Sequence, residues 1–278
     1  MVGIVVVSYR SADRTAAFVL EELSKVEIPH RIVVVDNGAT PEEAEALAAR
    51  LPGVKVIAAD NGGYARGNNL GAQWLRENVH PTHILFANDD VRLASDGVVE
   101  ALVDKASGNP QIGAIGPEVV GLDGLRQSPE PYMGLWKRYV WMRFCTPFMS
   151  KARKRKVFCL DYPEEAAEGF HYKLSGSFLL VDTEAFFQAG MFDENTFLYA
   201  EENILSERLA KIGKGFWFCP SVRVVHEHGK TVNAHYPGDC PALLQFHSMA
   251  YYYRQYRGYS RLSTGLAGLI YRSFLRLK

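Results

Sequence analysis

Short runs of apolar residues alternate with amphipathic stretches through the first half of the chain. The runs are rich in β-branched residues and predict strands at Ile4–Val7, Ile32–Val35, Val54–Ile57 and Ile84–Phe86. Between them, apolar positions at helical spacing predict helices near residues 14–25, 41–51, 66–77 and 96–106. Because the strands are apolar without alternation, we expect both of their faces to be buried, which is typical of a parallel sheet covered by helices. The pattern therefore predicts an α/β fold.

Polar residues follow each predicted strand. In chain order they are Ser8-Tyr9-Arg10, Asp36-Asn37-Gly38, Asp60-Asn61-Gly62-Gly63 and Asn88-Asp89-Asp90. Because open parallel sheets bind ligands at the carboxyl ends of their strands, these segments predict a binding site. Asp, Asn and Gly are also preferred turn residues, so a simple turn is the alternative for each segment taken alone.

Two common nucleotide-binding loops are missing from the sequence. Residues 8–13 follow the first strand in place of the GxGxxG sequence of dinucleotide-binding oxidoreductases, and no Walker A sequence GxxxxGK[ST] occurs. A nucleotide can also be held by a carboxylate that binds its base or ribose, together with a divalent cation that neutralises a diphosphate. Asp36 and the Asn88-Asp89-Asp90 cluster offer both parts.

The second half of the chain is less regular. Residues 174–181 are strand-like around Gly176 and Ser177, residues 197–212 carry an acid pair and then a helix, and residues 215–225 predict two short strands ending at His226. Residues 131–160 are aromatic and basic, which indicates an excursion from the sheet. The tail from Gln245 to Lys278 predicts two helices, the second with an approximate apolar stripe beside arginines.

Charge is unevenly distributed along the chain. The 278 residues include 31 Lys and Arg against 31 Asp and Glu, and 47% are hydrophobic, which predicts a globular protein and excludes disordered and collagen-like classes. Residues 131–160 hold eight basic side chains and residues 240–278 hold six, with no acid in either segment, so the rest has 17 basic against 31 acidic residues. A neutral total thus combines an acidic body with two basic segments.

Cysteine usage and the N-terminus indicate the compartment. The four cysteines are far apart without zinc-ligand spacing, which predicts free thiols in a reducing cytosol. The first apolar run has no basic residues before it and no cleavage site after it, so we expect a strand rather than a signal peptide. No stretch reaches the roughly 18 uninterrupted apolar residues of a spanning helix. We expect a cytoplasmic protein, whose tail either packs on the body or docks on the anionic inner face of the membrane.

The ordered set of motifs resembles family 2 glycosyltransferases of the inverting GT-A type, and in particular their rhamnosyltransferase-like branch. The resemblance covers roughly residues 3 to 230. It is carried by residues 5–9, 33–38, 61–69, 88–90, 176–178, 192–194 and 197–202 and by Val225-His226. It implies a GT-A fold with a mostly parallel central sheet covered by helices. The catalytic domain would span residues 1–240, with a nucleotide-binding half at 1–118 and an acceptor half at 119–240, and a helical extension would follow over 241–278.

The resemblance also implies roles for the strand-end residues. Asp36 would hold the uracil or thymine base and Asp89 the ribose, while Asp90, with His226 as a second candidate, would bind Mg²⁺ or Mn²⁺. Asn88 stands where relatives carry the first acid of a DxD motif, and an amide ligates hard cations more weakly. The remaining nucleotide-sugar candidates are Ser8, Tyr9, Arg10, Asn61, Gly63, Arg66 and Asn68, and the acceptor candidates are Gly176 and Ser177.

An acid pair supplies the expected catalytic base. Glu201-Glu202 stands where similar enzymes carry Glu-Asp at the start of a helix, and the second acid is the expected base, with Glu201 as the rival. Inversion needs one carboxylate to accept the proton of the attacking hydroxyl, while a metal can serve the leaving diphosphate. The alternative for the pair is a role as helix N-terminal acids that stabilise the helix dipole.

The resemblance implies transfer of a sugar, with dTDP-rhamnose as the first donor hypothesis, to a hydroxyl of a cell-surface glycan or lipid-linked acceptor. Two alternatives stay open: a UDP-hexose donor on the same scaffold, and a catalytically impaired subunit that only binds nucleotide sugars. The basic segments carry no nucleic-acid-binding motif, and no nucleic-acid partner is expected.

Overall fold

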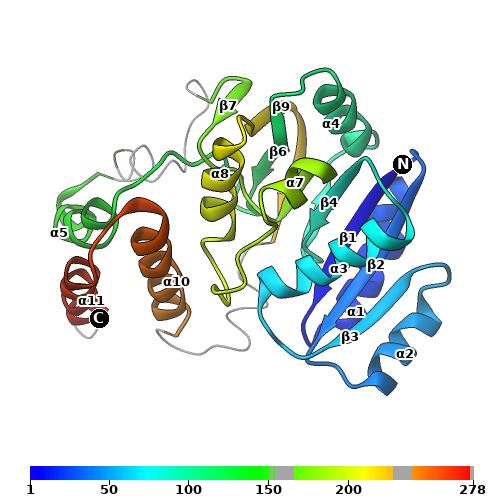
Figure 1. Ribbon diagram of the computed structural model, residues 1–278, viewed down its shortest axis with the longest axis horizontal. Coiled ribbons are helices and arrows are strands. Elements are labelled where there is room, and N and C mark those ends of the chain that lie inside the picture. Colours follow the sequence, from blue (N-terminus) through cyan, green and yellow to red (C-terminus); the bar gives the residue numbers. More distant parts are fainter. Residues whose placement is uncertain (151–152, 154–165, 228–239, 276–278) are drawn as a thin grey trace.

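One mixed sheet runs through the molecule (Figure 1). The computed structural model describes residues 1–150, 153, 166–227 and 240–275. The first four strands are β1 (Val2–Ser8), β2 (His30–Asn37), β3 (Lys55–Ala59) and β4 (His83–Ala87), and they pair in parallel in the order β3-β2-β1-β4. The predicted strands and their parallel pairing in this half are therefore confirmed.

Helices connect these strands as the pattern predicts. They are α1 (Ala12–Ala17), extended by a π turn η1 (Phe18–Glu22) and a 3₁₀ turn η2 (Leu23–Lys25), then α2 (Pro41–Arg50), α3 (Tyr64–Asn78) and α4 (Val98–Ser107). Thr40 explains the sharp start of α2, because its hydroxyl accepts from the backbone N–H of Glu43 while the Glu43 carboxylate accepts from the Thr40 N–H.

The second half of the sheet brings in antiparallel pairs. Its strands are β5 (Val91–Leu93), β6 (Ile112–Val120), β7 (Gly169–His171), β8 (Phe178–Asp182) and β9 (Gly215–His226). β8 lies antiparallel between β4 and β6, β9 lies parallel to β6, and β5 and β7 each pair antiparallel with β9. The pattern missed β6, whose Gly113, Gly116 and Pro117 weaken the strand signal although nearly all of its residues are buried.

Two predicted boundaries in this half are wrong. Residues 215–226 form one strand rather than two, because both halves pair with β6 across a register shift between Pro117 and Glu118. Residues 174–177 lie outside strand β8, which begins at Phe178, and they form instead a loop beside the acid pair.

Helices cover both faces of the sheet. In Figure 1, α3, α7 (Thr183–Gln188) and α8 (Glu201–Lys211) lie over one face, where Val5, Val35 and Phe86 join Leu205 and Leu209 in one core cluster. A second cluster on the opposite face joins sheet residues to α1, its η extensions, α2 and α4. The sheet is therefore buried on both sides, as its continuous apolar strands require.

A third core cluster lies beside the sheet. It joins η3 (Lys137–Trp141) and the start of α8 to α10 (Cys240–Arg257) and α11 (Arg261–Leu275). The short helices α5 (Met142–Cys145) and η4 (Thr146–Phe148) follow η3. Tyr139 packs edge-on against both Phe246 and Tyr271, which fastens the basic excursion to the C-terminal helices. The run Lys151–Lys156 falls, apart from Arg153, outside the described residues. The expected domain boundary near residue 240 stays a prediction.

Candidate active site

The carboxyl ends of β1 and β2 bring Ser8 and Asp36 side by side. The two residues are register partners in the parallel pair and both are buried. Burial raises the pKa of the Asp36 carboxyl, while a hydrogen bond from Ser8 opposes that effect. Tyr9 is half-buried and Arg10 is exposed above its ring, with the guanidinium carbon 5.4 Å from the ring centroid. Asp36 is thus the carboxylate nearest the strand end where the nucleotide was predicted.

Three side chains of the first helical segment hold Asp89. Arg14 donates from Nε (3.0 Å) and Nη2 (2.8 Å) to Oδ1, and the hydroxyls of Ser11 and Thr15 donate to Oδ2 at 2.7 and 2.8 Å. Sequence reasoning did not select these three residues, although their i, i+3, i+4 spacing puts them on one helix face. The ribose contact expected of Asp89 stays a prediction, and a ribose hydroxyl would share a carboxylate that is already well bonded.

Asp90 and His226 converge from β5 and β9. Asp90 directly precedes β5, where Val91 is the register partner of His226, and His226 Nε2 lies 3.2 Å from Asp90 Oδ1. Gln127, which the sequence did not single out, has its side-chain Oε1 2.7 Å from His226 Nδ1, so Nδ1–H donates there and Nε2 faces Asp90. Although burial opposes it, the pKa of the Asp90 carboxyl is lowered, because His226 in its protonated form and Arg14 stabilise the carboxylate.

This pair fits a hard divalent cation. The Asp90 Oδ1 atom is buried and is without a hydrogen-bond partner among the described residues, although His226 Nε2 lies 3.2 Å from it. A carboxylate oxygen and an imidazole nitrogen facing one point are a suitable but incomplete ligand set for Mg²⁺ or Mn²⁺. The described residues contain no cluster of three or more His, Cys, Asp or Glu side chains that could hold a metal. Further ligands would have to come from a bound diphosphate or water.

The segment from Asn61 to Asn69 fixes the start of α3. Gly63 has φ of 91°, and a Cβ atom there would lie 2.1 Å from the carbonyl oxygen of Phe197, which accepts from the N–H of Tyr64 at 2.9 Å. The Asn61 carboxamide accepts from the Gly63 N–H at 3.3 Å, and Asn68 donates to the Tyr64 carbonyl at 3.0 Å.

The same segment leaves one arginine at the surface. The Arg66 side chain is exposed, and its stem covers Gly62, where a Cβ atom would lie 2.3 Å from Arg66 Cδ. Through the hydrogen bond from the Tyr64 N–H to the Phe197 carbonyl, the segment joins the strand ends to the loop before α8.

The acid pair follows a strained turn. Tyr199 and Ala200 both have φ of 72°, a region that costs non-glycine residues free energy and that is found at functional sites. Glu202 is half-buried, and its Oε1 accepts from the Gly176 N–H at 3.0 Å. A Cβ atom at Gly176 would lie 2.4 Å from that oxygen, and the Gly176 carbonyl accepts from the Tyr64 hydroxyl at 2.8 Å.

Glu201 has a different environment. It is 2% exposed, and its Oε1 has no hydrogen-bond partner among the described residues. Burial, together with the neighbouring Glu202 carboxylate, raises the pKa of Glu201 to about 8, while Lys173 opposes the change. The two adjacent acids therefore differ, because burial disfavours the charge of Glu201 while Glu202 is the more accessible carboxyl.

The loop of Gly176 and Ser177 links the two sides of the site. The buried Ser177 carbonyl accepts from the N–H of half-buried Asn88 at 2.8 Å, while Gly176 bonds to Glu202. The structure therefore brings Asn88 and Glu202 to one loop, although more than a hundred residues separate them in the sequence.

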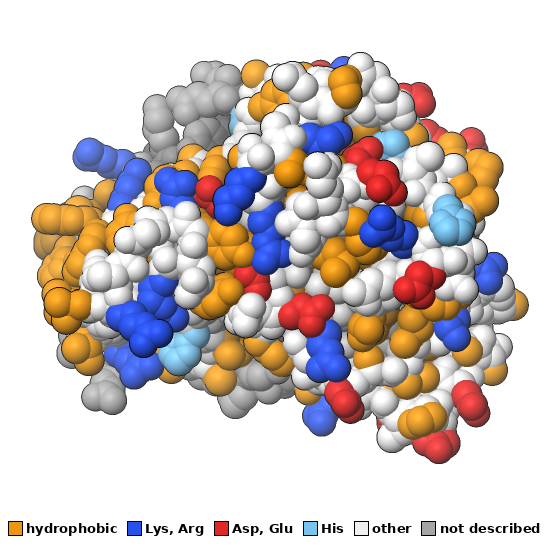
Figure 2. All heavy atoms as spheres, in the orientation of Figure 1, with side chains coloured by type: hydrophobic (Ala, Val, Ile, Leu, Met, Phe, Trp, Pro, Cys, Tyr) orange, Lys and Arg blue, Asp and Glu red, His pale blue; other side chains and the backbone are white. Residues whose placement is uncertain are grey.

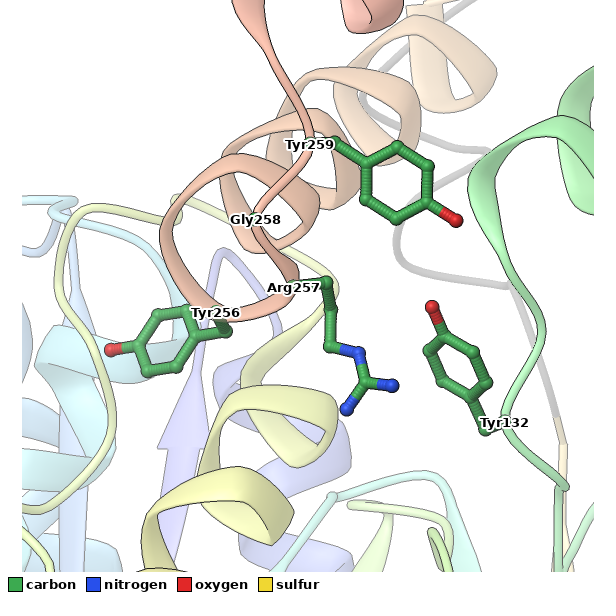
Figure 3. Close-up of a pocket in the computed structure, with 5 residues that line it drawn as sticks. All are labelled: Tyr132, Tyr256, Arg257, Gly258 and Tyr259. Atoms are coloured by element: carbon green, nitrogen blue, oxygen red, sulfur yellow. The ribbon is translucent and has the colours of Figure 1, made fainter.

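Among the described residues, two cavities lie at the C-terminal helices. One, of about 480 Å³, lies at the turn between α10 and α11, where the hydroxyls of Tyr132 and Tyr259 point toward each other and Arg257 reaches below them (Figure 3). Arg257 is engaged there, because it bonds to Glu207 at 3.0 Å and stacks 4.2 Å from the centre of the Tyr132 ring. The other cavity, of about 610 Å³, is a groove between α10 and α11.

Comparison with known proteins places this arrangement in a family. The model of glycosyl transferase family 2 matches residues 3–161. N-acetylglucosaminyl-diphospho-decaprenol L-rhamnosyltransferase of Mycobacterium tuberculosis is 31% identical over 255 residues, which cover 86% of this chain and 78% of that protein. The chain belongs to glycosyltransferase family 2.

Further comparisons agree with this assignment. The chain is 23% identical to rhamnosyltransferase WbbL of Escherichia coli, over 81% of this chain and 83% of that protein. A mannosyltransferase of Pyrobaculum calidifontis, solved with GDP-Man and Mn²⁺, superposes with a TM-score of 0.59 at 13% identity, covering 99% of this chain and 74% of that one. The predicted GT-A-like fold and glycosyltransferase class are thus confirmed, and the protein is rhamnosyltransferase-like.

Proposed function

We propose that this family 2 glycosyltransferase transfers rhamnose from dTDP-rhamnose, with inversion and with Mg²⁺ or Mn²⁺, to a hydroxyl of a lipid-linked glycan precursor of the cell surface. The observation that carries the proposal is the half-buried Glu202 carboxylate, fixed by the Gly176 N–H across the loop from Asn88 and next to the buried Glu201. The names of two relatives, both rhamnosyltransferases, support the choice of sugar.

The donor would bind along the strand ends. Asp36 has the position to accept from an N–H of the pyrimidine base, and Asp89, held by Arg14, to accept from the ribose. The side chains of Ser8, Tyr9, Arg10 and Arg66 and the turn at Asn61 and Gly63, supported by Asn68, would complete the nucleotide-sugar site.

The cation would bind between Asp90 and His226. The bound metal would neutralise the charge that develops on the departing nucleoside diphosphate. The protein's own contribution is to hold Asp90 ionised and His226 oriented by Gln127, so that both present lone pairs to the same point. The amide of Asn88 would add at most a weak ligand.

Glu202 would act as the base. Its carboxylate would accept the proton of the acceptor hydroxyl as that oxygen attacks the anomeric carbon from the face opposite the diphosphate. One acid pair can serve this role only if one member stays ionised near neutral pH. Since burial and the neighbouring carboxylate raise the pKa of Glu201, and Glu202 is the more exposed of the two, we assign the role to Glu202.

Substitutions distinguish Glu202, the proposed base, from its neighbour Glu201. We expect Glu202→Gln to lose turnover on the order of a thousandfold, since the amide cannot accept the proton, while donor affinity stays within about twofold. Turnover is measured as nucleoside diphosphate released with a short-chain N-acetylglucosaminyl-diphospho-lipid acceptor, and donor affinity by calorimetry. The exposed Glu45→Gln is the matched control. Unchanged turnover in Glu202→Gln, with loss in Glu201→Gln, would transfer the role to Glu201.

The chief rival is a hexose donor. A relative of Haloferax volcanii, 22% identical over 81% of this chain, is a hexosyltransferase, and a UDP-hexose would need only a changed sugar pocket on the same scaffold. A thermal-shift panel of dTDP-, UDP- and GDP-sugars with and without Mn²⁺ decides between donors. Binding of a nucleotide sugar without turnover on any acceptor would favour the impaired binding subunit instead.

A cytoplasmic location and peripheral attachment to the inner face of the membrane complete the proposal. No helix within the described residues has the length and apolar content needed to cross a bilayer. A lipid-linked acceptor would then have to be met at the membrane surface.

A further inference from the structure

The groove between α10 and α11 is cationic. Three arginines, Arg254, Arg261 and Arg272, line it together with His247, which lies 3.1 Å from the Arg272 guanidinium. None of the described residues that line it is acidic. Within the described part of the chain, none of the three arginines has a carboxylate in ion-pair distance, unlike the neighbouring Arg257. Arginines that lack protein carboxylates are suited to bind phosphate groups.

Small residues open the groove. Gly268 packs directly on Phe246, where a Cβ atom would come within 2.8 Å of the ring, and Gly265 faces open space. The two helices therefore approach closely at one end of the contact and leave room of about 610 Å³ beside it. A cavity of this size is typical of sites for small organic ligands.

One end of the groove meets the loop that leads to the acid pair. Phe197 lines the groove, and its carbonyl accepts from the N–H of Tyr64 in the nucleotide-sugar segment. Ser248 of α10 donates to the carbonyl of Leu198 at 2.7 Å, which fastens the groove to the strained turn before Glu202. A ligand in the groove would therefore lie next to the loop that positions the base.

Leucines continue from the groove onto the surface of α11. Leu262, Leu266 and Leu269 are 83%, 49% and 66% exposed, and Phe148 at the end of η4 is 91% exposed. Figure 2 shows hydrophobic and basic side chains gathered at the end of the molecule formed by α5, α10 and α11, with few acidic ones on that face. Exposed leucines beside arginines are the composition of a helix that lies in the headgroup region of a bilayer.

We propose that the α10–α11 groove binds the diphosphate of the membrane-embedded lipid acceptor, while Leu262, Leu266 and Leu269 enter the bilayer around its prenyl chain. The inference rests on the proposed function, because it takes its ligand from the lipid-linked acceptor. The lipid diphosphate would bind to Arg254, Arg261 and Arg272, and the attached sugar would extend past Phe197 toward Glu202. Binding at the groove thus orients the acceptor without using the donor site.

Vesicle flotation of the full chain tests the assignment. The probes are phosphatidylcholine vesicles that carry a polyprenyl diphosphate, and vesicles of matched charge that carry phosphatidylglycerol. We expect the protein to bind the diphosphate vesicles more tightly, and Arg261→Gln/Arg272→Gln to weaken that binding on the order of twentyfold, a loss that high salt reproduces in the wild type. Arg31→Gln/Lys55→Gln removes two exposed cations elsewhere and is expected to change nothing.

Substitutions at the exposed leucines of α11 test the proposed contact with the bilayer. Leu262→Gln/Leu269→Gln is expected to lower vesicle binding about tenfold or more, because each leucine loses its apolar burial in the bilayer. Leu20→Gln/Leu122→Gln, at two exposed leucines outside the groove, is the matched control. Donor binding, followed by thermal shift with Mn²⁺, is expected to stay unchanged in all four variants.

Three outcomes would overturn the inference. Absence of binding to either vesicle removes the docking surface, and equal binding to both makes the surface a general anionic membrane contact rather than an acceptor site. Unchanged vesicle binding in the arginine and leucine variants places the contact elsewhere. If vesicle binding follows the expectation but no nucleotide sugar is bound, the proposed function fails while the groove assignment for a lipid diphosphate stands.

Discussion

Buried carboxyl groups at the two sides of the candidate active site have opposite environments. At the strand ends, Asp89 is surrounded by Ser11, Arg14 and Thr15, which stabilise its charge. At the start of α8, Glu201 is buried next to Glu202 and has no hydrogen-bond partner for Oε1 among the described residues, which disfavours its charge. The strand ends thus stabilise negative charge, whereas the start of α8 disfavours the charge of Glu201.

Removal of the Asp90 carboxylate is expected to have the largest effect on turnover. Asp90→Ala is expected to abolish the thermal stabilisation that a nucleotide gives only with Mn²⁺, and to lower turnover by about a thousandfold or more, since metal assistance supplies several kcal/mol. The exposed Asp96→Ala is the control. A variant at Asp90 that still shows the full Mn²⁺-dependent shift would exclude this residue as a ligand.

The position of the base is tested on the α8 side. Gly176→Ala places a Cβ atom where Glu202 Oε1 now lies, so Glu202 must move. We expect kcat to fall on the order of a hundredfold, because a displacement near 1 Å is enough for such a loss, with unchanged donor affinity. Gly108→Ala, where the nearest atom would be 3.6 Å away, is the control. Equal losses in kcat and donor affinity would point to general damage instead.

The ion pair between Arg14 and Asp89 is tested through the free energy of unfolding. Arg14→Ala leaves a mostly buried carboxylate without its main partner, and we expect a loss of about 2 kcal/mol in the free energy of unfolding by urea. The control is Arg50→Ala, which breaks an exposed pair with Asp13 and is expected to cost less than about 1 kcal/mol. Similar losses of unfolding free energy in both variants would mean that the buried Asp89 carboxylate does not need Arg14 for its stability.

The suppressed charge of Glu201 predicts a smaller, pH-dependent effect. Since its pKa is raised in the folded state, its contribution to stability is full below the unfolded pKa of about 4.5 and is lost as pH rises toward about 8. The wild type is therefore expected to lose at least about 1 kcal/mol more than Glu201→Gln between pH 5 and pH 8. Urea unfolding at several pH values measures this, with the exposed Glu45→Gln as control. Parallel curves would mean that Glu201 is ionised in the fold.

The fold was predictable where the signal is local. The parallel strands β1 to β4 and the intervening helices follow from apolar runs and their spacing, because each run is short, continuous and bounded by polar residues. Strand β6 escaped prediction because its glycines and proline hide a strand that burial alone selects. The single strand β9 escaped because its two halves are joined only through pairing with β6.

The residues of the candidate site were also predictable from the sequence only in part. Asp36, Asp89, Asp90 and the acid pair stand out because they lie at strand ends or begin a helix within recognisable motifs. Arg14 and Gln127 do not stand out, since each acts only through a partner distant in sequence, Asp89 and His226. A side chain whose role is to orient another one leaves no motif of its own.

The sequence by itself determined the α/β class, the polar strand ends and the residue types available for nucleotide, metal and proton transfer, because these depend on local periodicity and composition. Only the tertiary structure decided that Asp90 faces His226, that Gly176 fixes Glu202, and that Glu201 is buried beside it without a hydrogen-bond partner for Oε1 among the described residues. Ionisation and coordination depend on burial and on partners from distant strands, and both are created when the chain folds.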